Sequence, residues 1–411
     1  MRSNGVGRSS RGMSRARKSL IAVTVLGVTV GLGANGGALA GALPSPGDTD
    51  SARVSANTGK ELNRSLNRIM AQKNGPPGVA VLIRKGNRDQ FLRRGVANVK
   101  TNAKITPRQH ARIASVAKAF NGGIVLSLAD QGKLKLSDRL GKWVPNLLPK
   151  ARRATIGQVL HHTAGLPEYI ESQKFIDLLN ANPRRYMAPR KLVSFVRNEK
   201  LDFRPGARYK YSDTDNIVAG IIAEKASGMS YNRLLERLGN RSGGLPGTSL
   251  PRTVKMPKPT LHGYYIEPGK APEDGTFVMN PALAWASGGI VSTLSDLGRY
   301  FRAYVGGKLF GGRIMEAQRQ WVKGSSGPPG PGVNWAGMSL FRYRTKCGTV
   351  FGHTGNYPGY RLFVASTADG KRSIVWATNS QITSTTKVPG AKRISALMRK
   401  SQVAAVCHAL R

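Results

Sequence analysis

The sequence predicts an α+β fold in which an antiparallel sheet, flanked by terminal helices, packs on an inserted helix-rich segment. Strand-like runs occur early in the chain, at Val79–Ile83 and Gln90–Val99, and again late, between residues 338 and 379. The residues between these two groups are typical of short helices and loops. Because both groups of strands have the character of antiparallel meanders, we expect them to form one sheet of five or more strands.

The first strands are preceded by a predicted amphipathic helix over residues 56–72. Its apolar residues recur at helical spacing and are Leu62, Leu66, Ile69 and Met70. The Gly-Pro-Pro-Gly run at residues 75–78 ends this helix. The two strands that follow flank residues 85–88 and therefore predict a hairpin.

A second helix is predicted to begin at Ser115 and to end near Gly132. It contains no proline and is apolar on almost every side, which indicates a central, buried helix. Gly122 and Gly123 each lower its helix propensity by about 1 kcal/mol. Their presence predicts close packing of neighbouring chain against this part of the helix.

The remaining elements follow from the same patterns. Further helices are predicted at Ile156–His162, at Ile217–Ala226 and, after a turn of small residues, at Val291–Val305. Late strands are predicted at Met338–Tyr343, Thr349–His353, Tyr360–Ser366 and Ile374–Asn379, and a final helix runs from Ala391 to about Ala405. Residues 324–332, rich in glycine and proline, predict a loop to which we assign no chemistry.

Residues 1–40 have the features of a secretory signal peptide. An apolar core at Leu20–Leu32 is short for a membrane span, and Ala38-Leu39-Ala40 fits a cleavage site. The basic residues before this core are Arg2, Arg8, Arg11, Arg15, Arg17 and Lys18. We therefore expect a secreted protein, with association with the cell wall as a further expectation; an uncleaved membrane anchor is the alternative.

The mature chain is expected to form one catalytic domain. Residues 41–55 are an N-terminal lead-in, and residues 56–411 form the domain itself. Its sheet part covers about residues 56–114 and 286–411, and its α-rich part about residues 115–285. We expect a monomer.

The chain is strongly basic, with 64 Lys and Arg against 21 Asp and Glu in 411 residues. Loss of the signal peptide removes six basic residues and no acidic one, which leaves a net charge of +37. This charge suits proximity to an anionic cell-wall polymer or membrane phosphate. Because the cations are spread along the chain and no nucleic-acid motif occurs, we expect no nucleic-acid partner.

Ser115 and Lys118 are the candidate catalytic pair. At the start of a helix, residues three apart share a face, so the lysine amine can reach the serine hydroxyl. A serine hydroxyl is a poor nucleophile until a neighbouring base takes its proton. A second Ser-x-x-Lys match begins at Ser384, but it runs into Val388-Pro389-Gly390, which argues against a helix there.

Two further stretches carry candidate site residues. Residues 203–216 hold Tyr211 and Asp213 in a Phe-x-Pro-Gly…Tyr-Ser-Asp pattern, and residues 352–360 contain His353-Thr354-Gly355-Asn356. With Ser115 and Lys118, they resemble the three motifs of the serine β-lactamase and penicillin-recognising family. The resemblance is nearest to the branch of class C β-lactamases, D-alanyl-D-alanine carboxypeptidases and related esterases, in its His-Thr-Gly variant, and extends from about residue 60 to 407.

This resemblance implies a role for each motif residue. Ser115 is the nucleophile of an acyl-enzyme, and Lys118 and Tyr211 are the base and acid, in an order left open. An adjacent ammonium favours the phenolate of Tyr211, and His353 offers a positive charge or a hydrogen bond near neutral pH. The alternatives are a packing role for Tyr211 and a surface strand position for His353. Thr354 and Gly355 provide a strand edge for the substrate, and the backbone N–H groups of Ser115 and Asn356 form the oxyanion hole.

Two positions depart from the family pattern. Asp213 stands where the family usually has asparagine, and an ionised carboxylate accepts hydrogen bonds but donates none. Phe341 occupies the position at which the carboxypeptidase relatives have an arginine for the substrate carboxylate. Arg342 is adjacent, but strand alternation places it on the opposite face. Both departures weaken the case for cleavage of D-Ala-D-Ala.

The two cysteines, Cys347 and Cys407, suggest a disulfide in an exported protein, like that of the carboxypeptidase relatives; two buried thiols are the alternative. His161 and His162 are adjacent, with no other ligand type spaced to join them, so no metal site is suggested. No organic cofactor is implied.

The sequence thus predicts a secreted serine hydrolase of the carboxypeptidase or β-lactamase type. Its substrate is expected to be a small peptide, a lactam or an ester. An esterase or D-amino-acid amidase on the same scaffold is the first alternative. A non-catalytic penicillin-recognising protein or a cationic wall-binding protein is the second.

Overall fold

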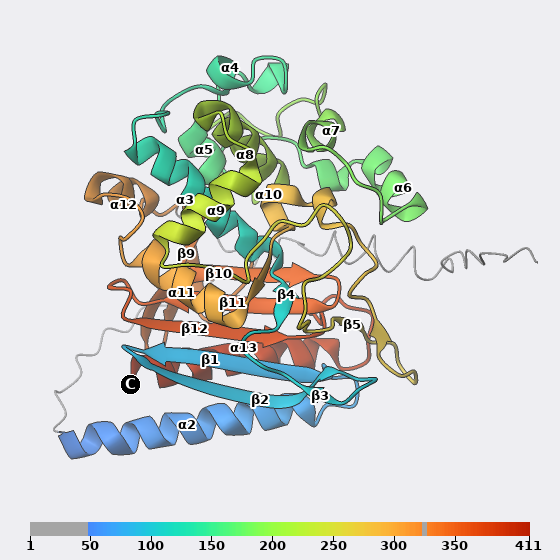
Figure 1. Cartoon of the computed structure of the whole chain (residues 1–411), viewed down its shortest axis with the longest axis vertical. Helices are drawn as coiled ribbons and strands as arrows, with labels where there is room; N and C mark the ends of the chain where they lie inside the picture. The colour runs from blue at the N-terminus through green and yellow to red at the C-terminus, as the bar shows by residue number, and fades with distance from the viewer. Residues whose placement is uncertain (1–47, 323–326) are drawn as a thin grey trace, which may run out of the picture.

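A computed structural model describes residues 48–322 and 327–411 (Figure 1). The predicted signal peptide and residues 41–47 of the lead-in lie outside the described residues. The first helix of the described chain, α2, spans Asp48–Met70 and so begins before residue 56, where we predicted its start. The predicted α+β fold is confirmed.

The centre of the fold is an eight-stranded antiparallel sheet in the order β3-β2-β1-β12-β11-β10-β9-β8. Its strands are β1 (Gly78–Lys85), β2 (Arg88–Asn98), β3 (Ala103–Lys104), β8 (Val333–Gly337), β9 (Leu340–Thr345), β10 (Gly348–Tyr357), β11 (Tyr360–Ser366) and β12 (Arg372–Thr378). The N-terminal hairpin joins the C-terminal strands through β1 and β12, whose register runs from Val79 opposite Thr378 to Lys85 opposite Arg372.

Helices cover both faces of this sheet (Figure 1). On one face α2 packs beside the C-terminal helix α13 (Ala391–Leu410), and α11 (Leu294–Val305) lies on the other. Alternate residues of β1 divide accordingly: Val81 packs with the α2 and α13 side chains, whereas Leu82 joins the larger core on the α11 side. In the described part of the chain, no helix is both long and apolar enough to cross a bilayer.

Between the two groups of strands the chain forms a helix-rich layer. Its elements are β4 (His110–Arg112), η1 (Ala114–Val116), α3 (Ala117–Asp130), α4 (Leu140–Trp143), η2 (Pro149–Ala151), α5 (Ile156–Leu160), η3 (Tyr169–Glu171), α6 (Gln173–Ala181), α7 (Pro189–Ser194), α8 (Asp213–Ser227), α9 (Tyr231–Arg241), β5 (Tyr264–Tyr265), β6 (Glu273–Asp274), η4 (Pro281–Leu283) and α10 (Trp285–Gly288). Then β7 (Val291–Thr293) precedes α11, and α12 (Gly312–Gln318) follows it.

Helix α3 is buried on every side, as its composition predicted, and packs mainly against α8, α9 and α10. The predicted close packing at its glycines is also present. A Cβ atom at Gly123 would lie 2.3 Å from the Tyr300 hydroxyl, which donates a hydrogen bond to the carbonyl of Ala119. The two glycines therefore let α11 and residue 339 approach the α3 backbone.

Some predicted boundaries differ from the structure, and three of these differences have a clear physical cause or leave out an element. The helix predicted at Val291–Val305 is the short strand β7, paired with β4, followed by α11, because the Thr293 side chain caps α11 at Asp296 N–H. Helix α8 begins at Asp213 rather than at Ile217, since Ser212 caps it. The strand predicted at Met338–Tyr343 is β9, and β8 before it was not predicted.

Candidate active site

Ser115 lies in the 3₁₀ turn η1, directly before α3, rather than in the first turn of α3 itself. Ala114 has a φ of 53°, a left-handed conformation that non-glycine residues rarely adopt. Strand β10 packs against this turn. A Cβ atom at Gly355 would lie 2.4 Å from the carbonyl oxygen of Ile113, so only glycine permits this backbone contact. The turn and the strand are thereby held together beside Ser115.

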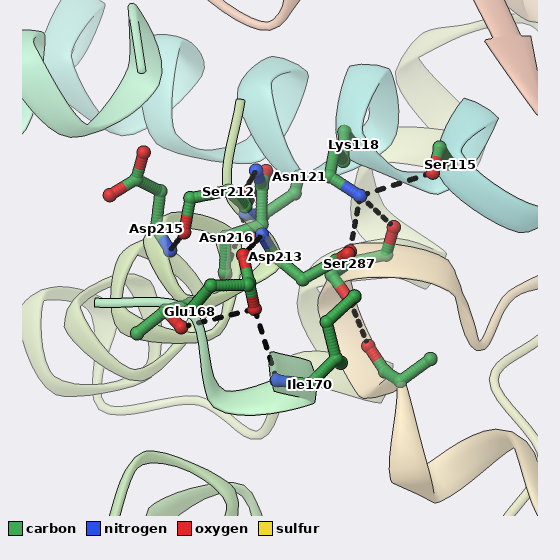
Figure 2. A network of polar contacts seen from close by, with 12 residues as sticks. Ser115, Lys118, Asn121, Glu168, Ile170, Ser212, Asp213, Asp215, Asn216 and Ser287 are labelled. Carbon is green, nitrogen blue, oxygen red and sulfur yellow. Dashed lines mark hydrogen bonds and ion pairs between the residues drawn. The ribbon is translucent and has the colours of Figure 1, made fainter. Parts of the chain in front are cut away.

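Lys118 is a fully buried side chain whose amine faces three acceptors (Figure 2). Its Nζ donates to Ser115 Oγ at 3.2 Å, to Asp213 Oδ1 at 2.5 Å and to the Ser287 carbonyl at 2.9 Å. An ammonium group has three N–H donors, so all three are satisfied. The structure thus joins Ser115, Lys118 and Asp213, which come from η1, α3 and the start of α8.

Tyr211 lies just before α8, with its ring 4.9 Å from Lys118 Nζ. Burial raises the pKa of Tyr211 well above its ordinary value, and Asp213 acts in the same direction, whereas interaction with Ser115 lowers it. We predicted that the Lys118 charge would favour the phenolate. That prediction is wrong because desolvation dominates, and Tyr211 is a protonated phenol at neutral pH.

Glu168 is a buried carboxyl group that the sequence reasoning missed. Its Oε2 accepts a hydrogen bond from Asp213 N–H at 2.5 Å, and its Oε1 accepts from Ile170 N–H and the Thr214 hydroxyl at 3.3 Å each (Figure 2). Burial and the neighbouring Asp213 raise the pKa of Glu168 to about 7. The one sequence feature that could have drawn attention to Glu168 is its position directly after the Gly165-Leu166-Pro167 turn.

A buried histidine–carboxyl pair, His162 and Asp215, packs against Tyr211 through the histidine ring. His162 Nδ1 lies 2.9 Å from Asp215 Oδ2, and the Ser212 N–H donates to the same nitrogen at 3.3 Å. Burial raises the pKa of Asp215 and lowers that of His162, which favours the neutral form of both groups. The His162 ring packs 4.7 Å from the Tyr211 ring.

His162 is therefore a packing residue of the site. Across residues 48–322 and 327–411, no three metal-ligating side chains gather closely enough to hold an ion.

His353 lies on β10 and is fully buried. Its Nδ1 donates to the Thr354 carbonyl at 2.6 Å, and its ring packs edge-on against Phe341 at 5.0 Å. Burial, with a smaller effect of Lys118, lowers the pKa of His353 to about 3. Of the two roles expected for His353, the lowered pKa disfavours the positive charge, and the hydrogen bond that the ring donates through Nδ1 goes to the Thr354 carbonyl.

Phe341 and Arg342 point to opposite faces of β9, as strand alternation predicted. Phe341 is buried, and its ring lies 6.5 Å from that of Tyr211. The Arg342 guanidinium instead stacks over Trp335 and Trp321, at 4.3 and 5.2 Å. At the position where the carboxypeptidase relatives carry an arginine, the structure therefore places a phenyl ring.

A pocket opens beside Ser115, and its polar side is formed by Tyr211, Asp213, Thr354 and Asn356. The apolar part of the lining, which we call the apolar wall, includes Tyr169, Ile170, Phe175, Leu179, Met279 and Leu283. Pro328 also lines the pocket, and the Tyr209 hydroxyl donates to Gly327 O at 2.5 Å. Residues 327 and 328 of the loop predicted at 324–332 therefore lie at the pocket, although we assigned this loop no chemistry.

Strand β10 presents an unpaired edge to this pocket. Its pairing with β9 ends at Gly352, whereas its pairing with β11 continues to Tyr357. Residues 353–357 are therefore free of β9 on the side that meets η1. Gly355 makes the backbone contact, and Thr354 and Asn356 line the pocket.

Cys347 and Cys407 form the predicted disulfide, with Cα atoms 5.1 Å apart. The bond joins the turn between β9 and β10 to α13. The predicted pairing is confirmed, and it lies outside the pocket lining.

The sequence of this chain is similar to a known protein family and to several curated proteins. The Beta-lactamase family model matches residues 66–397. Penicillin-binding protein 4* of Bacillus subtilis is 23% identical over 301 residues, which cover 70% of this chain and 64% of that protein. Protein flp of Staphylococcus aureus is 30% identical over 202 residues, covering 48% and 39%. The chain thus spans less than two thirds of either relative.

Solved structures show the same fold over nearly their whole length. A D-stereospecific amidohydrolase from Streptomyces sp. has a TM-score of 0.69 and 26% identity, and the match covers 78% of this chain and 94% of that one. The D-amino acid amidase of Ochrobactrum anthropi SV3, complexed with L-phenylalanine amide, has a TM-score of 0.72 and 21% identity, with 84% and 98% covered.

Proposed function

Because this chain belongs to the beta-lactamase family of serine hydrolases, we propose that Ser115 is its nucleophile and that it hydrolyses small amides or esters through an acyl-enzyme. The observation that carries the proposal is the 3.2 Å contact of Lys118 Nζ with Ser115 Oγ at the wall of the pocket. The predicted signal peptide supports action outside the cytoplasm.

Acylation begins with attack of Ser115 Oγ on the substrate carbonyl carbon, and the hydroxyl proton must leave as this bond forms. In the resting site all three N–H groups of the Lys118 ammonium donate hydrogen bonds, so its nitrogen has no free lone pair. Lys118 must therefore lose one proton before it can act as a base. The Asp213 carboxylate, 2.5 Å away, is the acceptor in place for that proton. Lys118 then acts as the base toward Ser115.

Tyr211 is assigned as the acid. Its raised pKa keeps the phenolic proton in place until a leaving nitrogen or oxygen needs it. After it gives this proton to the leaving group, Tyr211 regains one from Lys118, and Lys118 regains one from Asp213. In deacylation, water attacks the ester carbonyl and the same groups carry the protons in reverse.

The developing oxyanion requires two N–H donors. Tyr357 and Tyr360 close a two-residue hairpin, so ladder alternation directs the N–H of Asn356 away from β11 and toward the pocket. The Ser115 N–H at the start of the η1–α3 segment is the second donor. This support is independent of side-chain identity at both positions.

The apolar wall favours an acyl group with an apolar side chain. Phe341 offers no charge to a terminal carboxylate, which argues against the D-Ala-D-Ala carboxypeptidase reading and favours an amidase or esterase. The likeness to the Streptomyces D-stereospecific amidohydrolase supports the same choice. D-Amino-acid amides with apolar side chains are therefore the proposed substrate class.

A β-lactam is the second candidate acyl donor. The name of penicillin-binding protein 4* supports it, as does the presence of Ser115, Lys118 and Tyr211 in one pocket. The four-membered ring of a β-lactam strains its amide bond, so its carbonyl is more reactive toward Ser115 than that of an acyclic amide.

The test is to mix the protein separately with D-phenylalanine amide, L-phenylalanine amide and benzylpenicillin, with the Ser115→Ala variant as control. Product release and intact mass are followed together. Release of D-phenylalanine that is lost in the variant supports the amidase. A stable mass gain with penicillin alone supports the second candidate. Undiminished turnover by Ser115→Ala would overturn both.

A further inference from the structure

A second concave surface lies between α2, α13 and residues 329–334. Five cations line this groove: Arg64 and Arg68 on α2, Lys346 after β9, and Arg399 and Lys400 on α13. It shares no lining residue with the pocket at Ser115. We call it the basic groove.

Four of the five cations of the basic groove have no acidic partner among the described residues. The one carboxylate in its lining, Glu61, lies 3.7 Å from Lys346. Among the described residues, no carboxylate lies within ion-pair distance of Arg64, Arg68, Arg399 or Lys400. Arg64 and Arg68 are also one helical turn apart, where like charges repel.

Packing of the two helices does not require this charge. Helix α2 is held by Leu62, Leu66 and Ile69, which are fully buried, and α13 contributes Ile394 and Met398 to the same core. The cations lie on the faces turned away from that core, and Arg64, Arg68 and Lys400 are exposed. The basic groove thus brings mutually repelling positive charges together, although the packing of α2 and α13 does not need them.

We propose that the basic groove binds a linear, phosphate-bearing polymer. Arginine forks bind phosphate oxygens in pairs, and cations on opposite walls of a groove suit a chain that runs between them. A flat membrane fits less well, because Val333 is the one large apolar side chain exposed here in the described chain.

The groove adjoins the catalytic pocket through one loop. Pro328 lines the pocket at Ser115, whereas Pro329 and Gly330 line the basic groove. A bound polymer would therefore lie beside the active site without filling it. The proposal stands whether or not the proposed function is correct.

The test measures binding of fluorescently labelled long-chain polyphosphate by anisotropy at several salt concentrations. The groove variant combines Arg64→Gln, Arg68→Gln and Lys400→Gln. The matched control combines Lys133→Gln, Lys174→Gln and Arg233→Gln. These three are exposed cations outside the groove, and their side chains have no hydrogen bond or ion pair in the described structure. Both variants lose three positive charges.

We expect the groove variant to bind at least about tenfold more weakly, with the slope of log K against log salt reduced by about 2, and the control to change little. Equal weakening of both variants, or of neither, would overturn the proposal, because binding would then reflect net charge alone. A second result would also overturn it: the wild-type protein binds phosphatidylglycerol vesicles more strongly than polyphosphate, and the groove variant binds the vesicles as strongly as wild type does. Unfolding midpoints of both variants verify that the fold is intact.

Discussion

Lys118 Nζ and Asp213 Oδ1 lie 2.5 Å apart, so the buried amine beside Ser115 is paired with a carboxylate at the position where the sequence resemblance led us to expect an asparagine amide. Glu168 holds this carboxylate in place through the Asp213 backbone N–H. Two acidic groups therefore stand behind one lysine. The protonation states of Lys118, Asp213 and Glu168 are therefore the feature that distinguishes this site.

Ser115→Ala should abolish turnover and acyl-enzyme formation, because no other hydroxyl contacts Lys118 Nζ in the described site. Ser384 offers a matched control, since it begins the other Ser-x-x-Lys sequence but lies in a turn after β12. Ser384→Ala should retain wild-type rates. Intact-mass measurement with an acylating substrate distinguishes the two variants.

Asp213→Ala should lower the free energy of unfolding by on the order of 3 kcal/mol, because Lys118 would remain buried without its partner. Asp213→Asn should lose less, since the amide oxygen still accepts a hydrogen bond from Lys118. Urea denaturation of both variants measures the difference. Equal losses would show that the negative charge alone stabilises the site.

Glu168→Gln should flatten the dependence of stability on pH. The folded protein holds the Glu168 proton up to a pKa of about 7, whereas the unfolded chain releases it near 4.5. Glu168 therefore costs stability as pH rises through this window, and the cost is constant above it.

Between pH 5 and pH 8, wild type should lose about 2–3 kcal/mol relative to Glu168→Gln. Denaturation at both pH values tests this, with Glu171→Gln as control because Glu171 is exposed. Parallel pH profiles for wild type and Glu168→Gln would contradict the assignment.

Ile170→Ala should lower kcat/KM for D-phenylalanine amide relative to D-alanine amide by about tenfold, because Ile170 lines the apolar wall and is partly exposed. Ile176→Ala removes the same atoms from a partly exposed position of α6 outside the pocket lining. That control should leave the ratio unchanged. An unchanged ratio in Ile170→Ala would mean that the substrate side chain lies elsewhere.

Replacement of Cys347 and Cys407 by serine should lower stability by about 4 kcal/mol, because the bond closes a separation of 60 residues. Activity below the new melting temperature should persist, since the bond lies outside the pocket lining. Thermal unfolding and initial rates, measured on the same sample, separate the two effects.

The sequence predicted the elements that local signals define. The Ser115–Lys118 spacing, the Tyr211 motif and the strand at His353 rest on short patterns, and the structure brings these residues into one region. Strands β7 and β8 escaped prediction because they have three and five residues and depend on distant partners. Short runs of this kind carry little periodicity.

The electrostatic errors have a different origin. Whether Tyr211 is a phenolate or His353 a cation depends on how much water the fold removes, which no local pattern reports. Local patterns also miss Glu168 and the His162–Asp215 pair, because the interacting residues are 45 and 53 positions apart in the sequence. Only the folded chain brings these groups together.

The pairing of β1 with β12 has a consequence for how this enzyme matures. The first strand of the chain and the last one must meet before the sheet is continuous, and almost 300 residues separate them. Strand β10, against which the Ser115 turn is packed, belongs to the same late segment. A ribosome-bound or truncated chain that lacks the final strands therefore carries Ser115 without its opposing wall. We therefore expect catalytic competence only after the strands up to β12 have been synthesised and paired.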